Sequence, residues 1–173
     1  MSDLPQYSVN MVCKRISVFF ASDEFQGKFQ ERFNFGKITP IKGTEDVSKY
    51  IRSQFQKEAL PYVPCVETVP ISKTFGTMRD MEEIVIKMRI TIPSRYTQSQ
   101  MALQPEGYYE CNYNDDLEPV ANFLISELSQ QMTLGAVFKN GEIIWGSAIS
   151  GNPLSSVEVA LNFFGNPATL GGA

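Results

Sequence analysis

The chain has 173 residues, of which 43% are hydrophobic and 20% are charged, and its formal net charge is −4. This length suits a single domain with its own buried core, and the acidic balance argues against a strongly basic nucleic-acid-binding protein. The sequence contains no histidine, which excludes histidine-based triads, histidine-ligated zinc and the usual general base near neutral pH.

The cysteines and the apolar runs exclude further classes of protein. Cys13, Cys65 and Cys111 form an odd set at wide spacing, which predicts reduced structural thiols and neither a disulfide framework nor a metal knuckle. No apolar run approaches the roughly 20 residues of a membrane helix, and no nucleotide-binding or hydrolase motif is present. We therefore expect a soluble protein made in the cytoplasm, without membrane contact and without a cofactor.

The N-terminal part of the chain is predicted to form a β-hairpin. Its first strand covers residues 9–20, where apolar residues of even number share one face. Its second strand covers residues 27–35, after a polar turn at residues 22–24, and its phenylalanines alternate with polar residues. A short helix is the alternative for this second segment, because its phenylalanines also lie four residues apart behind a potential N-cap at Ser22 or Asp23. The glycines at its two ends favour the strand.

The middle of the chain predicts a helix followed by two strands. The helix covers residues 44–61, with acidic residues in its first turn after Thr44 and apolar residues at helical spacing. A strand near a sheet edge is expected over residues 65–71, between prolines and a turn. The strongest pattern lies in residues 81–93, where isoleucines and a methionine of even number alternate with charged residues. This period of two predicts a half-buried central antiparallel strand.

Residues 94–116 are predicted to form a long polar loop, and such loops are usually functional or mobile. The next element is a helix over residues 116–130, capped by Asp115 or Asp116, with an apolar face at helical spacing. A tight hairpin is expected over residues 134–148, because Asn140-Gly141 suits a type I′ turn. Residues 156–164 alternate as a last strand, and residues 166–173 are predicted to be a flexible tail.

Together these elements predict one α+β domain over residues 1–173. Its sheet should be mixed but mainly antiparallel, with two principal helices packed on one face, because only two segments combine helical periodicity with caps.

The residues of the long loop suggest a protein–protein interface. The loop is rich in tyrosine and contains one arginine, and large aromatic side chains with polar tips are favoured at interfaces. The alternative is a loop that folds its tyrosines over its own core. The candidate interface residues are Arg95, Tyr96, Tyr108, Tyr109 and Tyr113.

A second candidate site is a stacking platform for single-stranded nucleic acid. Exposed aromatic rings can stack on bases while cations contact phosphates. Simple core packing is the more common role of alternating phenylalanines, and a true platform would place rings and cations on one face, whereas here they alternate. The candidate residues are Phe29, Arg32, Phe33, Phe35 and Lys37.

Two acidic clusters could supply oxygen ligands for a hard cation. They are Asn114-Asp115-Asp116 and the group of Asp80, Glu82 and Glu83. Neither has the register of an EF-hand, and helix caps and solvated strand ends account for both. No metal site is therefore expected.

The order of elements resembles a family of phage proteins. From residue 44 onward the chain reads helix, strand, long strand ending in Ile-Pro, loop, helix, strand and strand, an order similar to that of the tail-terminator and tail-completion proteins of tailed bacteriophages. The segments that carry the resemblance are residues 65–71, 81–93, 116–130 and 156–164. It implies a non-enzymatic virion component of the tail or neck that forms homo-oligomeric rings or tubes through sheet edges and loops, together with other assembly proteins.

Two other functions remain as alternatives to this assembly role. The first is a single-stranded nucleic-acid-binding protein built on the N-terminal elements. The second is an enzyme that uses carboxylates and tyrosines, which ranks last because no side chain has a natural pKa near 7.

Overall fold

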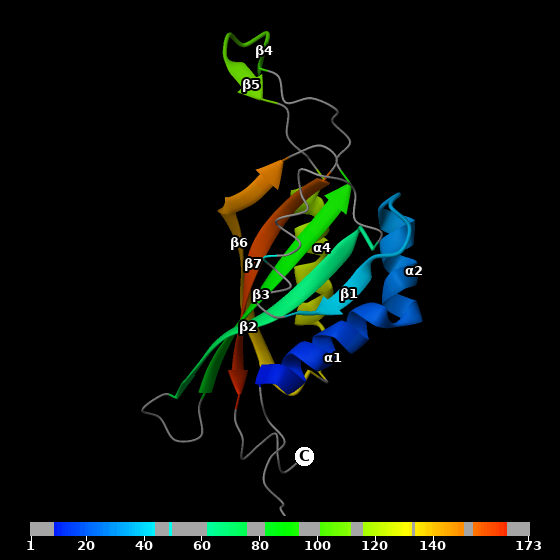
Figure 1. The fold of residues 1–173 in the computed structure, drawn as a ribbon, viewed down its shortest axis with the longest axis vertical. Helices are drawn as coiled ribbons and strands as arrows, with labels where there is room; N and C mark the ends of the chain where they lie inside the picture. Colours follow the sequence, from blue (N-terminus) through cyan, green and yellow to red (C-terminus); the bar gives the residue numbers. More distant parts are fainter. Residues whose placement is uncertain are drawn as a thin grey trace, which may run out of the picture.

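The computed structural model describes residues 9–43, 49, 62–75, 82–93, 101–111, 116–132, 134–150 and 154–165. Figure 1 shows how the elements are arranged. The helices of these ranges are α1 (Val9–Ala21), α2 (Asp23–Arg32) and α4 (Leu117–Ser129). The strands are β1 (Thr39–Lys42), β2 (Cys65–Phe75), β3 (Glu82–Pro93), β4 (Met101–Leu103), β5 (Tyr109–Cys111), β6 (Val137–Ser150) and β7 (Leu154–Gly165).

A five-stranded sheet in the order β1-β2-β3-β7-β6 forms the centre of the molecule. β1 runs parallel to β2, and all other neighbours in this sheet are antiparallel. β3 is the middle strand, so the prediction of a central antiparallel strand is confirmed. The predicted α+β class with a mixed, mainly antiparallel sheet is also confirmed.

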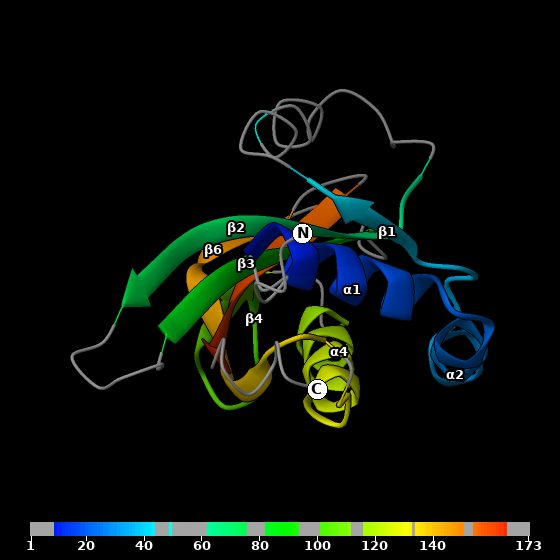
Figure 2. The same ribbon diagram turned by 90° about the horizontal axis from the view of Figure 1, so that it is seen from below.

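Helices α1 and α4 both lie on the same face of this sheet, as Figure 2 shows. Alternate residues of β3 and β7 point to that face and are buried, and they meet buried residues of the two helices. Burying one large aliphatic side chain stabilises a fold by about 1.5 to 3 kcal/mol, so this layer holds the molecule together. Its strand residues are Ile84, Ile86, Met88, Ile90, Ile92, Val157, Val159, Leu161 and Phe163.

The first predicted strand is wrong, because these residues form helix α1. The buried residues Val12, Cys13, Ile16 and Phe20 recur at intervals of one, three and four, which is the spacing of one helix face. Val12, Ile16 and Phe20 lie four residues apart, so they fit a period of two as well as a period of 3.6. Two other residues distinguish the two patterns. Cys13 is buried and Val18 is 61% exposed, which fits one face of a helix and not the even-numbered face of a strand.

The second predicted strand is also wrong, and the helix alternative is correct: these residues form α2. Ser22 is the N-cap, and its Oγ accepts a hydrogen bond from the backbone N–H of Phe25 at 3.3 Å. Asp23 and Glu24 in the first turn and Arg32 in the last suit the helix dipole. Sheet pairing is replaced here by packing of aromatic rings between α2 and its neighbouring helices.

The predicted hairpin at Asn140-Gly141 is wrong as well, because β6 continues through it as one strand. Asn140 pairs with Asn162 and Gly141 with Leu161, and the Nδ2 of Asn162 donates to the Oδ1 of Asn140 at 2.8 Å. A Cβ at residue 141 would lie 3.2 Å from the side chain of Ile125 in α4. The glycine therefore permits close packing of α4 on β6 and does not form a turn.

The predictions for three other segments are confirmed. Residues 65–71 lie in β2, residues 116–130 contain α4, and residues 156–164 lie in β7. β2 is the second strand from the edge, since the short β1, which the sequence did not predict, lies outside it.

The remaining predictions concern the loop, the middle helix and the tail. The loop expected over residues 94–116 is not wholly irregular, because it contains the hairpin of β4 and β5. The helix expected over residues 44–61 lies outside the described residues, apart from the helical residue Lys49. The tail expected over residues 166–173 also lies outside them.

Candidate assembly interface

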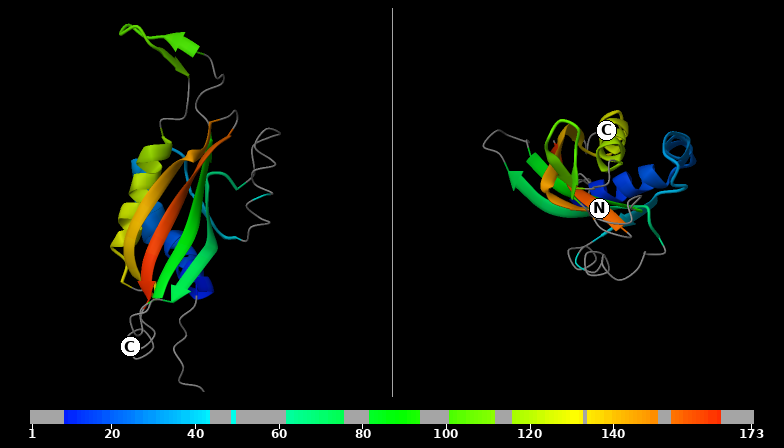
Figure 3. Two further views of the ribbon diagram at one scale, coloured as in Figure 1. Left: turned by 90° about the vertical axis from the view of Figure 1, so that its left-hand side faces the viewer. Right: turned by 90° about the horizontal axis from the view of Figure 1, so that it is seen from above.

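A two-stranded hairpin projects from one end of the molecule. β4 and β5 are antiparallel, with Leu103 opposite Tyr109. The turn is closed by the N–H of Gln104, which donates to the carbonyl of Tyr108 at 2.7 Å, and by Gly107, whose φ of 94° favours glycine. Figures 1 and 3 show the hairpin beyond the end of the central sheet, apart from the labelled helices and strands. An isolated two-stranded hairpin is only marginally stable in water, which makes this one a candidate for contact with a second surface.

The hairpin exposes large side chains. Leu103 is 61% exposed, Tyr108 53% and Tyr109 67%. Tyrosine and other aromatic side chains are enriched among the residues that dominate binding energy at protein interfaces. Glu106 and Glu110 are the only charged residues between positions 101 and 111, so the hairpin combines an apolar surface with a charge of one sign.

The outer edge of β6 is a second exposed apolar surface. β6 is the last strand of the sheet, and within the described part of the chain no strand pairs with its outer side. An edge strand presents backbone N–H and C=O groups with which another chain can pair. Four large apolar side chains of this strand are exposed to solvent: Val137, Ile144, Trp145 and Ile149. We call these four residues the β6 strip.

A β-bulge sets the position of Trp145 in this strip. The register of β6 on β7 shifts between Ile144 and Ile149, and Figure 1 shows β6 bending sharply toward its end. The Oγ of Ser147 donates to the carbonyl of Ile144 at 2.6 Å and accepts from the N–H of Glu158 at 2.9 Å. These bonds hold the bulge to the sheet while Trp145 stays 49% exposed. Bulges at sheet edges commonly re-aim a side chain in this way.

A buried ion-pair cluster supports the same part of the sheet from the face opposite the helices. Arg89 is 1% exposed, and its guanidinium donates to the carboxylate of Glu158 and to the Oγ of Ser156, the latter at 3.2 Å. The Nζ of Lys87 lies 3.8 Å from the same carboxylate. The cluster links β3 to β7 beside the bulge, and its two cations share one carboxylate, so we interpret it as structural.

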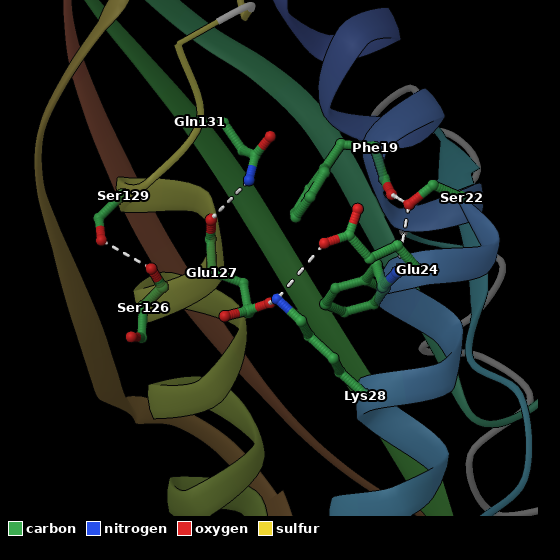
Figure 4. Close-up of polar contacts among 9 residues, drawn as sticks. Phe19, Ser22, Glu24, Lys28, Ser126, Glu127, Ser129 and Gln131 are labelled. Carbon is green, nitrogen blue, oxygen red and sulfur yellow. Dashed lines mark hydrogen bonds and ion pairs between the residues drawn. The ribbon is translucent and has the colours of Figure 1, made fainter.

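Two of the grooves that the described residues form lie on the helical side of the molecule. The larger, of about 860 Å³, is between α2 and the start of α4, and its lining is balanced in charge: Lys28, Arg32, Glu31 and Asp116. The smaller, of about 470 Å³, runs along α1 to the end of α4. Figure 4 shows part of its wall, with Phe19 and Ser22 across from Gln131.

The predicted interface residues divide into two groups. Tyr108 and Tyr109 are placed together on the exposed hairpin. Arg95, Tyr96 and Tyr113 lie outside the described residues. Sequence reasoning missed Trp145 and the rest of the β6 strip, because it divided this segment into two short strands at an expected turn, whereas the segment forms one long edge strand. The only tryptophan of the chain, next to two isoleucines, was the signal that could have found it.

The predicted stacking platform does not form as expected. Phe29 is 0% exposed and Phe33 8%, and their rings pack against Phe123 of α4 with centroids 6.3 and 5.5 Å apart. Phe35 is partly buried against the core. Arg32 and Lys37 are exposed, but the buried rings of Phe29 and Phe33 have no free face on which a base could stack.

The remaining ionisable groups show no catalytic arrangement in the described ranges. Cys13 and Cys65 are buried free thiols. Burial raises the pKa of the Cys13 thiol to about 11 and that of the Cys65 thiol to about 12, and thiols so protonated are poor nucleophiles at neutral pH. Among the described residues no group of three or more acidic or cysteine side chains could hold a metal ion.

Neither the helices nor comparisons with known proteins assign the chain to a class. Within the same ranges, no helix is long and apolar enough to cross a membrane. No protein-family model and no curated protein matches the chain. The exposed hairpin and the β6 strip are therefore the features that bear on function.

Proposed function

We propose that this protein is a non-enzymatic assembly protein whose copies join into a homo-oligomeric ring or tube, as a component of a phage tail or neck that also contacts other assembly proteins. The observation that carries the proposal is the outer edge of β6, a strand of 14 residues that exposes the four apolar side chains of the β6 strip. Long exposed edges of this kind favour pairing with another chain.

A second copy of the chain is the occupant that this surface fits best. The described residues expose apolar side chains at several separate places, among them the β6 strip and the hairpin. A symmetric dimer needs one self-complementary surface, whereas a ring or tube needs two different surfaces that meet between neighbouring subunits. The order of elements, which resembles that of ring-forming phage tail proteins, supports the same proposal.

The test is to place a charge on the β6 strip and to measure association. Ile144→Lys puts a cation at a position that is 38% exposed in the wild type, and Ile71→Lys does the same at a position of β2 that is 52% exposed. Because both side chains are already exposed, both variants should fold. Sedimentation velocity should show an oligomer for the wild type and for Ile71→Lys, and a shift toward monomer for Ile144→Lys. A wild type that stays monomeric at every concentration would rule out the proposed function.

A further inference from the structure

The hairpin is an acidic arm with an apolar surface. Glu106 is exposed, Glu110 is partly exposed, and residues 101–111 contain no lysine or arginine. Leu103, Tyr108 and Tyr109 are all more than half exposed. A surface that binds this arm should therefore combine apolar contacts with positive charge, because complementary charges fix the orientation of an interface and steer its formation.

The groove along α1 has these properties. Met11, Val18 and Phe19 supply apolar surface, and Lys14 and Arg15 supply positive charge. Among the described residues of its lining none is acidic, and the other two are Ser22 and Gln131. Val18 is 61% exposed, and Met132, which follows the lining residue Gln131 in the chain, is 94% exposed.

Two other exposed surfaces of the described residues lack this match. In the groove between α2 and α4, Lys28 and Arg32 are offset by Glu31 and Asp116. The Nζ of Lys28 also lies 3.3 Å from the carboxylate of Glu127, and Figure 4 shows these two side chains together. On β6 itself, the charged residues Lys139 and Glu142 balance each other. Neither place offers an excess of positive charge to an acidic arm, and of these three surfaces the groove along α1 is its complement.

The hairpin and the groove of one molecule lie too far apart to meet. Figure 1 shows the hairpin beyond one end of the sheet, while α1 and the C-terminal end of α4 lie toward the other end, and the left view of Figure 3 agrees. We propose that the β4–β5 hairpin of one subunit docks into the α1 groove of the next subunit, a head-to-tail contact that rests on the proposed homo-oligomeric function. Such a contact joins different surfaces and therefore builds rings or tubes.

The test exchanges the charges of the two surfaces. In the double variant Glu106→Lys, Glu110→Lys the arm becomes basic like the groove, and in the double variant Lys14→Glu, Arg15→Glu the groove becomes acidic like the arm. Each variant alone should associate about tenfold or more weakly than the wild type by sedimentation velocity, because like charges then face each other. Mixing the two variants at equal concentration should restore association, because the basic arm of one then meets the acidified groove of the other. The restored contact should weaken as salt is added.

The double variant Lys37→Glu, Lys42→Glu is the matched control, since it makes a change of charge of the same size at two exposed positions away from the groove lining. It should associate like the wild type, and circular dichroism should show that all three variants are folded. If the wild type forms oligomers but the charge variants associate as it does, the hairpin docks elsewhere and this inference fails while the proposed function stands. If mixing does not restore association, the head-to-tail contact is also refuted. If the wild type is monomeric throughout, both proposals fail.

Discussion

The body of the molecule and the β4–β5 hairpin use their large side chains in opposite ways. In the body, the core residues of β3 such as Ile86 and Ile90 are 0% exposed, whereas Tyr109 in the hairpin is 67% exposed. The body therefore obtains its stability from contacts within one chain, whereas the hairpin leaves its large side chains exposed, and we propose that they contact another chain. Because of this difference, we expect substitutions to separate into two classes. Those in the body should change the free energy of unfolding, and those on the hairpin should change the strength of self-association.

The largest effect on unfolding is expected at Arg89. Arg89→Ala removes the guanidinium that donates to Glu158 and leaves that carboxylate with Lys87 at 3.8 Å. Breaking a buried pair in this way should reduce the free energy of unfolding by about 3 to 5 kcal/mol, measured by urea denaturation. Lys139→Ala is the control, because its pair with Glu83 is exposed and should be worth about 0 to 1 kcal/mol. Equal losses would mean that the cluster is not structural.

The aliphatic core comes next. Ile86→Ala truncates a fully buried side chain and should cost about 2 to 5 kcal/mol of unfolding free energy by the same measurement. Ile71→Ala, at a position that is 52% exposed, should change it by less than about 0.5 kcal/mol. A large loss at residue 71 would show that the side chain of this residue belongs to the body.

The hairpin tyrosines test the other side of the comparison. Tyr108→Ala and Tyr109→Ala should leave the unfolding midpoint of the monomer nearly unchanged, because both side chains are more than half exposed. Each should weaken self-association by about 1 to 4 kcal/mol, as truncation of an aromatic anchor does, measured by sedimentation velocity. If they destabilise the monomer and leave association intact, the tyrosines are part of the fold.

The smallest effect is expected where α4 packs on β6. Gly141→Val would place methyl groups against Ile125, which a Cβ already approaches to 3.2 Å, and such overpacking should cost about 1 to 3 kcal/mol. Gly146→Val is the control, because a Cβ there would have no atom within 4 Å. Thermal unfolding should show a lower midpoint for the first variant only. Equal midpoints would mean that α4 does not constrain this strand.

The strands with strict alternation could be predicted because one face of each meets the helices. β3 and β7 show the period of two directly, and α4 combines acidic residues at its start with helical spacing. The N-terminal helices could not be assigned from periodicity alone, since Val12, Ile16 and Phe20 lie four apart and fit both periods. In residues 23–32 the helix is favoured by tertiary packing, because the phenylalanine rings of α2 pack against Phe123 of α4.

Long-range contacts explain the other differences. The local signal of Asn140-Gly141 favours a turn, but pairing of β6 with β7 along most of its length outweighs that signal. β1 has only four residues and is defined by its parallel partner β2, which no local pattern reveals. For the candidate site, composition located Tyr108 and Tyr109, whereas the β6 strip depends on which strand is at the edge of the sheet, and that is a property of the topology.

Native mass spectrometry of the wild-type protein tests the central claim most directly, because it reports stoichiometry and any bound nucleic acid together. The proposed assembly function predicts a closed oligomer larger than a dimer at micromolar concentration, without oligonucleotide mass. A protein that remains monomeric over the whole concentration range, or a monomer that carries oligonucleotide, would contradict it.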